Sequence, residues 1–108
     1  MQKLSALNAT NTKVINAHVN ADDLVCVALY NFIQAMQNGK QYDGWLVYEL
    51  NAAYDNDNSY NMQNADAAMG RNYARIALEY YENDETDSAF VYANMALLQR
   101  TLTLDLLA

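Results

Sequence analysis

The chain of 108 residues is 53% apolar and carries a formal net charge of −7 at pH 7, so it can form one domain with its own core. This acidic balance disfavours nucleic acids and anionic membranes as partners, because like charges repel over a Debye length. Proline is absent and glycine occurs three times, which disfavours collagen-like and turn-rich β folds and predicts an all-α protein.

The N-terminal sequence and the single cysteine indicate the compartment. Residues 1–13 contain no apolar stretch of the length that a signal peptide needs, and no run of about 18 apolar residues occurs in the chain. Cys26 lies between Val25 and Val27, which predicts a buried thiol without an internal disulfide partner. We therefore expect cytoplasmic residence.

The first half of the chain predicts a short N-terminal segment and a helical hairpin. Residues 1–19 carry a weak helical pattern, which predicts a short helix or arm. Residues 20–54 form the predicted first hairpin. Its first helix starts at Asn20, which can cap it, and stops at Gly39, because glycine readily adopts the left-handed backbone conformation that ends a helix. Its second helix runs from about residue 42 to 54 and carries its apolar residues at Trp45, Leu46, Leu50 and Ala53.

The second half predicts a loop followed by another hairpin. Residues 55–64 are rich in Asn and Asp, whose side chains bond to their own backbone, so we expect a loop. Residues 65–107 form the predicted second hairpin, with its second helix starting near Thr86. The final TLTLDLL also alternates with period two, so a terminal strand is the alternative to a helix.

Small and aromatic residues recur at regular spacings in residues 70–103. The first helix there carries one group and the second helix the other: Tyr73, Ile76, Ala77 and Tyr80, then Ala89, Ala93 and Ala96. This pattern resembles the tetratricopeptide repeat, a helix-turn-helix unit of about 34 residues. One constant shift places Val47 on Val91 and Tyr48 on Tyr92, so residues 20–54 resemble a degenerate copy. The alternative is a generic antiparallel helical hairpin.

The alanines have a physical role under either interpretation. Two helices approach each other closely only where their contact residues are small. We therefore expect Ala89 and Ala96 to be the contacts within the second hairpin, with Tyr73 and Tyr80 filling the volume beside them.

The repeat resemblance implies a concave surface that holds another protein or a peptide, formed by the first helix of each hairpin. Carried over by register, the expected partner-binding residues are Tyr30, Asn31, Gln34, Gln37, Arg71, Arg75, Leu78 and Tyr81. The two arginines lie together on an acidic protein, which favours a partner segment with a carboxylate. The alternative is that they only balance acidic residues on the same helix, namely Asp66 and Glu79 or Glu82.

Catalytic and metal-binding residues are sparse in this sequence. His18 is the only histidine, so we expect no enzyme and no cofactor. The loop offers one calcium motif, with ligands expected from Asp55, Asp57, Ser59 and Asp66. Tyr60 stands where a calcium loop needs glycine, so this calcium site is the lesser alternative.

Two further features suggest other modes of association. The acidic residues around the second hairpin's turn, together with the net charge, make a small phage-type inhibitor or DNA mimic the competing hypothesis. The leucine-rich C-terminal tail presents Leu98, Leu102 and Leu106 as association residues. Either the N-terminal segment covers them, or two copies pair as a homodimer.

Overall fold

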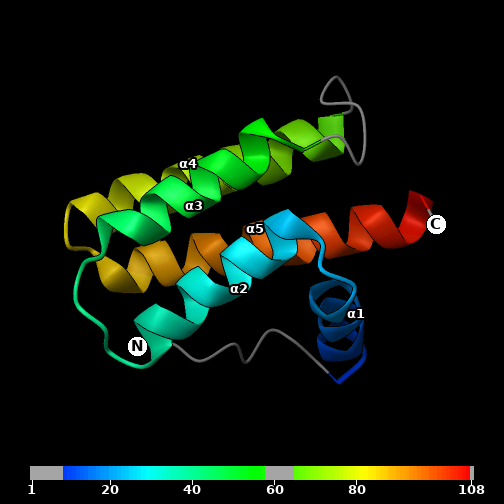
Figure 1. Ribbon diagram of the computed structural model, residues 1–108, viewed down its shortest axis with the longest axis horizontal. Coiled ribbons are helices and arrows are strands. Elements are labelled where there is room, and N and C mark those ends of the chain that lie inside the picture. The colour runs from blue at the N-terminus through cyan, green and yellow to red at the C-terminus, as the bar shows by residue number, and fades with distance from the viewer. Residues whose placement is uncertain (1–8, 58–64, 108) are drawn as a thin grey trace.

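The computed structural model describes residues 9–57 and 65–107, and these residues form five helices (Figure 1). The helices are α1 (Ala9–Asn20), α2 (Leu24–Gln37), α3 (Gly44–Asp55), α4 (Ala65–Glu82) and α5 (Thr86–Leu107). The described ranges contain no strand, so the all-α class is confirmed. The alternative of a terminal strand is wrong, because α5 continues to Leu107.

The helix ends follow from local side-chain chemistry. Asp23 caps α2, since its carboxylate accepts a hydrogen bond from the backbone N–H of Cys26 at 3.0 Å. Asn20 therefore does not cap α2 as expected, because it belongs to the last turn of α1. Gly39 follows α2 with a φ of +74°, and Lys40 N–H reaches back to the carbonyl of Ala35, as expected for a glycine stop.

Small residues bring α4 and α5 together along most of their length. Ala77 on α4 and Ala89, Ala93 and Ala96 on α5 are all fully buried, and these two helices share the most extensive packing in the described chain. A Cβ atom at Gly70 would lie 3.4 Å from the side chain of Gln99, which is an ordinary contact distance, so α4 and α5 are also close at this position. Ala89 and Ala96, which we expect to be the contacts within the second hairpin, are both fully buried.

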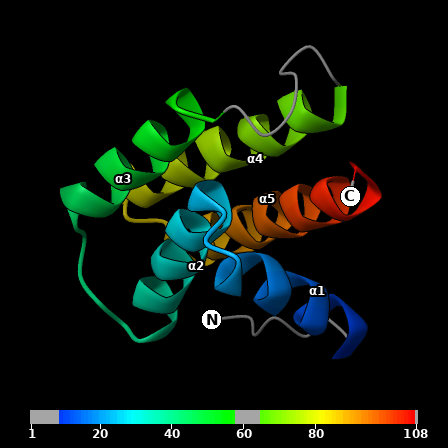
Figure 2. The same cartoon turned by 45° about the vertical axis from the view of Figure 1, so that its right-hand side comes forward.

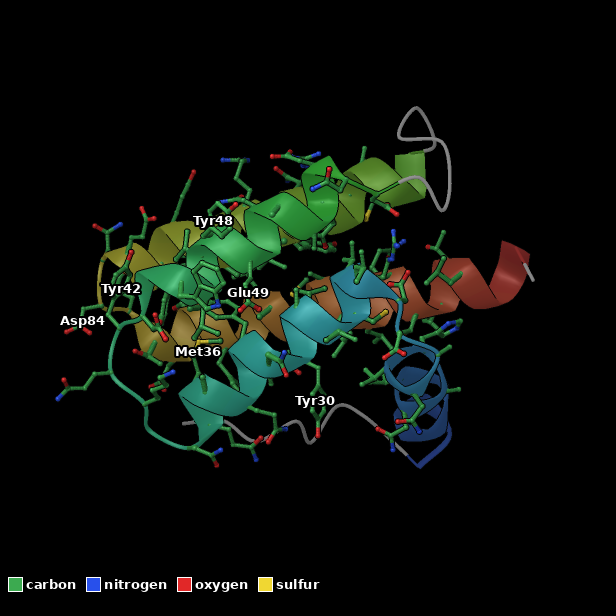
Figure 3. All side chains as sticks on the ribbon, viewed as in Figure 1. Tyr30, Met36, Tyr42, Tyr48, Glu49 and Asp84 are labelled. Carbon is green, nitrogen blue, oxygen red and sulfur yellow. The ribbon has the colours of Figure 1, made fainter. Side chains whose placement is uncertain are left out.

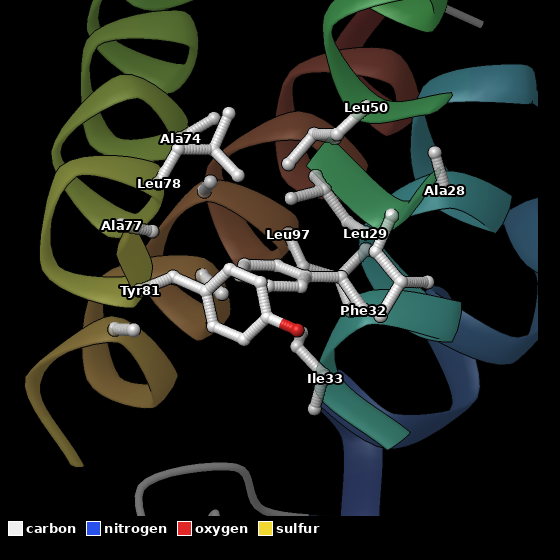
Figure 4. Close-up of a cluster of buried hydrophobic side chains, with 14 of the residues drawn as sticks. Ala28, Leu29, Phe32, Ile33, Leu50, Ala74, Ala77, Leu78, Tyr81 and Leu97 are labelled. Atoms are coloured by element: carbon white, nitrogen blue, oxygen red, sulfur yellow. The ribbon is translucent and has the colours of Figure 1, made fainter. Parts of the chain in front are cut away.

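The core lies where α5 meets its neighbours. α5 packs against α4, α2 and α1, and α2 also packs against α3. Figure 4 shows Phe32 of α2 and Tyr81 of α4 meeting near Leu97 of α5, and their rings make an edge-to-face contact at 4.8 Å. Leu50 brings α3 into the same cluster. The tetratricopeptide-like interpretation stays a prediction.

The N-terminal helix covers part of the C-terminal tail. α1 lies beside α2 and α5 in both views, and its Ile15 is buried (Figure 2). Leu98 is half-buried, Leu102 is exposed, and the side chain of Leu106 lies outside the described residues. The possible homodimer stays a prediction. No described helix combines the length and apolar character needed to cross a membrane.

Candidate functional site

The structure separates the expected partner-binding residues. Leu78 and Tyr81 are 7% and 4% exposed, so their assignment to an open concave surface is wrong. The reason is that Leu78 belongs to the buried core and that the ring of Tyr81 packs edge-on against Phe32 of α2. The hydroxyl of Tyr81 accepts a hydrogen bond from the N–H of Asp43 at 2.7 Å, and the Tyr42 ring stacks on the Tyr81 ring at 4.9 Å.

The two expected arginines lie together beside a pocket between α3 and α4. Arg71 forms an ion pair with Asp55 and lies over the ring of Tyr54 at 5.7 Å. Arg75 pairs with Glu79 at 2.7 Å, one turn along α4, as the alternative interpretation expected for this pair. Leu78 also lines this pocket, which has a volume of about 350 Å³. Both guanidinium groups are therefore already engaged by carboxylates of the chain.

The expected polar residues of α2 do not reach this pocket. Asn31 and Gln37 are exposed, Tyr30 and Gln34 are half-buried, and none of them lines the pocket beside the arginines. Figure 3 shows Tyr30 on the side of α2 that points away from α3. The sequence-predicted surface is thus not one continuous site.

The carboxylates of the proposed calcium loop belong to arginine pairs. Asp55 pairs with Arg71, and Asp57 accepts two hydrogen bonds from Arg100 at 2.6 and 2.9 Å. Ser59 and the side chain of Asp66 lie outside the described residues. Among the residues that the structure describes, no group of three His, Cys, Asp or Glu side chains is placed to hold a metal. The geometry therefore offers the calcium hypothesis no support.

A buried ion triad of Asp23, Arg100 and Asp57, which sequence reasoning missed, fixes α2 and α3 on α5. Arg100 is only 1% exposed, and its guanidinium also donates to Asp23 at 3.1 and 2.8 Å. Burial raises the pKa of Asp23, but hydrogen bonds from Arg100 and Cys26 outweigh it and hold the pKa below its ordinary value. Burial also raises the pKa of Cys26, which is the expected buried thiol.

Three large aromatic side chains are exposed near the start of α3. Tyr42, Trp45 and Tyr48, here called the aromatic surface, are 55%, 61% and 62% exposed. The rings of Trp45 and Tyr48 stack at 5.2 Å. Trp45 was expected among the apolar residues of this helix, but the buried residues of α3 follow another face: Leu46, Leu50 and Tyr54. That spacing of four residues was the available signal that Trp45 points elsewhere.

Asp43 holds the aromatic surface in place. Its carboxylate caps α3 by accepting a hydrogen bond from the N–H of Trp45 at 2.9 Å, and it pairs with Lys40 at 2.8 Å. The hydrogen bond from Lys40 and that from the Trp45 backbone lower the pKa of Asp43. Because the N–H of Asp43 also donates to the hydroxyl of Tyr81, a buried residue, the start of α3 is tied to the core.

An apolar groove of about 270 Å³ adjoins the aromatic surface between α2 and α3. It is called the α2–α3 groove and is lined by Leu24, Val27, Ala28, Tyr48, Glu49, Ala52, Ala53 and Asn56. Leu24 at its rim is 66% exposed. Figure 3 shows Glu49 on the side of α3 that faces α2. The arrangement provides apolar contact area with one carboxylate in it, and it presents no nucleophile beside a base.

The acidic residues at the α4–α5 turn are exposed. This group consists of Glu82, Asp84, Glu85 and Asp87. Asp84 adopts a φ of +61°, which ends α4 and turns the chain toward α5. Asp87 lies in the first turn of α5, where the helix dipole favours a negative charge.

Comparison of the chain with protein-family models, curated proteins and solved structures found no match.

Proposed function

We propose that this protein is a non-enzymatic protein-binding module that holds another protein through the aromatic surface and the adjoining α2–α3 groove. The observation that carries this proposal is the exposure of Tyr42, Trp45 and Tyr48 near the start of α3. Exposed apolar patches mark interaction sites, and Trp and Tyr are the side chains that most often dominate binding energy at interfaces.

Ring stacking at the aromatic surface favours the same function. Binding costs free energy when side chains must be ordered, and this cost is smaller when they are held beforehand. Trp45 is stacked on Tyr48, and Tyr42 is stacked on Tyr81, which is buried. A partner therefore meets rings whose positions are already restricted.

The competing hypothesis of an acidic inhibitor relies on charge alone. Binding through the acidic turn between α4 and α5 would weaken strongly as salt rises, because exposed charges are screened. Binding through the aromatic surface buries apolar area and keeps most of its affinity at high salt. The salt dependence of the affinity separates these two functions.

A photo-crosslinking experiment tests the proposed function. A photoreactive phenylalanine replaces Tyr48 in one protein and Tyr30, on the far side of α2, in a control. Position 48 should capture a partner that position 30 does not. The purified partner is then titrated calorimetrically with wild type and with Trp45→Ser/Tyr48→Ser.

The expected loss for the double variant is at least about 2 kcal/mol of binding free energy, the usual size of an interface hot spot. Val91→Ser/Met95→Ser removes two exposed apolar side chains from α5 and serves as the matched control, with unchanged affinity. Equal losses of binding free energy in the two double variants, or no loss in a folded Trp45→Ser/Tyr48→Ser protein, would contradict the proposal.

A further inference from the structure

A second apolar surface runs along α4 and α5, separate from the aromatic surface on α3. On α5 it consists of exposed and half-buried residues spaced four, three and four apart, namely Val91, Met95, Leu98 and Leu102. On α4 the same spacing gives another set of exposed and half-buried residues, namely Met69, Tyr73, Ile76 and Tyr80. These two stripes together are here called the α4–α5 face.

Contacts between the two helices place both stripes on the same side of the α4–α5 pair. The ring of Tyr92, which follows Val91 on α5, lies 5.7 Å from the ring of Tyr80 and 6.4 Å from that of Tyr73. The three tyrosines therefore bridge the two stripes. The buried residues of α5 occupy other positions along the helix, so they leave this side of it outside the core.

The α4–α5 face carries no charged residue, although the chain has a net charge of −7. Within residues 88–104 the only charged side chain is Arg100, which is buried in the ion triad. On α4, Arg71 and Arg75 line the pocket toward α3, and Glu79 pairs with Arg75. An apolar surface without charges is typical of interfaces between identical subunits.

The spacing of the stripes indicates what such a surface packs against. Steps of three and four residues are the pattern by which helices pack side by side in coiled coils and four-helix bundles. A single stripe fits one further helix, whereas two adjacent stripes fit another pair of helices. Gly70, next to Met69, lies beside Gln99, next to Leu98, so the two stripes also run at the same level.

We propose that two copies of this chain associate through the α4–α5 face and form a four-helix bundle from α4 and α5 of each copy. The expected association residues Leu98 and Leu102 belong to this face. The interface does not include the aromatic surface, so the inference is independent of the proposed function.

The acidic turn between α4 and α5 sets the orientation of the two copies. It carries four exposed carboxylates, those of Glu82, Asp84, Glu85 and Asp87. If the two turns lay at the same end of the bundle, these like charges would repel each other within a Debye length. An antiparallel arrangement places the turns at opposite ends. Val91 of one copy then meets Leu102 of the second copy, and Met95 meets Leu98.

Sedimentation equilibrium of the full chain tests the association, and wild type should be a dimer at high micromolar concentration. Met95→Glu on α5 and Met69→Glu on α4 should each weaken the dimer by at least about a hundredfold, because an unpaired carboxylate is costly to bury. These positions are 38% and 44% exposed in the single chain, so both variants should keep the helical circular dichroism of wild type. Asn31→Glu adds the same charge to an exposed position of α2 and is the matched control, with an unchanged dimer.

A short bismaleimide crosslinker tests the orientation. At 1.5 Å of rise per residue, the antiparallel arrangement offsets the two copies of residue 95 by about 5 Å along the bundle and those of residue 87 by about 28 Å. Met95→Cys should therefore give a crosslinked dimer and Asp87→Cys should not. Wild type, whose Cys26 is buried, should stay uncrosslinked.

A wild type that remains monomeric at high micromolar concentration overturns the inference. So does a dimer that folded Met95→Glu and Met69→Glu proteins leave intact, or one that Asn31→Glu weakens equally. Crosslinking through Asp87→Cys that matches crosslinking through Met95→Cys contradicts the antiparallel arrangement. The proposed function stands or falls separately, because its test concerns side chains of α3.

Discussion

Replacement of Arg100 by methionine tests how the ion triad holds the fold. Methionine approximates the length and apolar volume of the arginine stem but removes the guanidinium that bonds to Asp23 and Asp57. The change therefore leaves two carboxylates without their main counter-charge among α2, α3 and α5.

The magnitude follows from the burial of the three groups. Side-chain exposure is 1% for Arg100, 3% for Asp57 and 13% for Asp23. Removal of one partner from a buried ion pair costs about 3–5 kcal/mol, because an uncompensated charge remains. Asp57 is more deeply buried than Asp23, so Asp57 should account for the larger share. A loss of this size is a large fraction of the roughly 5–15 kcal/mol that holds a typical domain.

Urea denaturation followed by circular dichroism measures this loss at about pH 7. Arg100→Met/Asp57→Asn should recover part of the lost unfolding free energy, since a neutral amide replaces the carboxylate that has lost its pair with Arg100. Arg100→Lys should be less stable than wild type, because an ammonium cannot form two bidentate pairs. Arg75→Met removes an exposed arginine from an i,i+4 pair and should cost no more than about 0.5 kcal/mol. If Arg100→Met folds and loses less unfolding free energy than Arg75→Met, the ion triad does not stabilise the fold as described.

Three further changes probe the cap, the helix contact and the tie between α3 and α4. In the folded protein the pKa of Asp23 lies below its ordinary value of 3.8, so the ionised carboxylate stabilises the fold fully above about that pH and this stabilisation is lost as the pH falls further. Asp23→Asn removes this titration, so the urea midpoint of the variant should decline less at acidic pH than that of wild type. Ala93→Leu overpacks the α4–α5 contact and should cost about 1–3 kcal/mol in thermal or urea unfolding, whereas the exposed Val91→Leu should stay within about 0.5 kcal/mol. Tyr81→Phe removes the acceptor of the Asp43 N–H and should cost about 0.5–1.5 kcal/mol in urea unfolding, and an unchanged midpoint would contradict that role.

Local signals in the sequence account for much of the fold. The all-α class follows from the absence of proline and the scarcity of glycine, and Gly39 marks the end of α2 as expected. The burial of Ala89 and Ala96 follows from the spacing of small residues on one helix face. These features depend on neighbours within one or two helical turns, so periodicity is sufficient to find them.

Long-range contacts account for what sequence reasoning missed. Arg100 lies in a leucine-rich stretch, and its partners are 77 and 43 residues away, so no local pattern predicts the triad. The position of Tyr81 in the repeat-like pattern predicts an open surface, but its contacts with Phe32 and Asp43 bury it. The exposure of Trp45 likewise depends on which face of α3 meets the core, which the packing of α2 and α4 decides.

Acrylamide quenching of Trp45 fluorescence, in the free protein and in the complex with the partner captured at position 48, shows whether the aromatic surface is covered on binding. Trp45 is the only tryptophan and is 61% exposed in the free chain, so its emission reports on the aromatic surface alone, provided that the partner contributes no tryptophan or has it replaced. The proposed function predicts strong quenching in the free protein and clear protection, with a blue-shifted emission, in the complex. A saturated complex in which Trp45 remains as quenchable as in the free protein would contradict it.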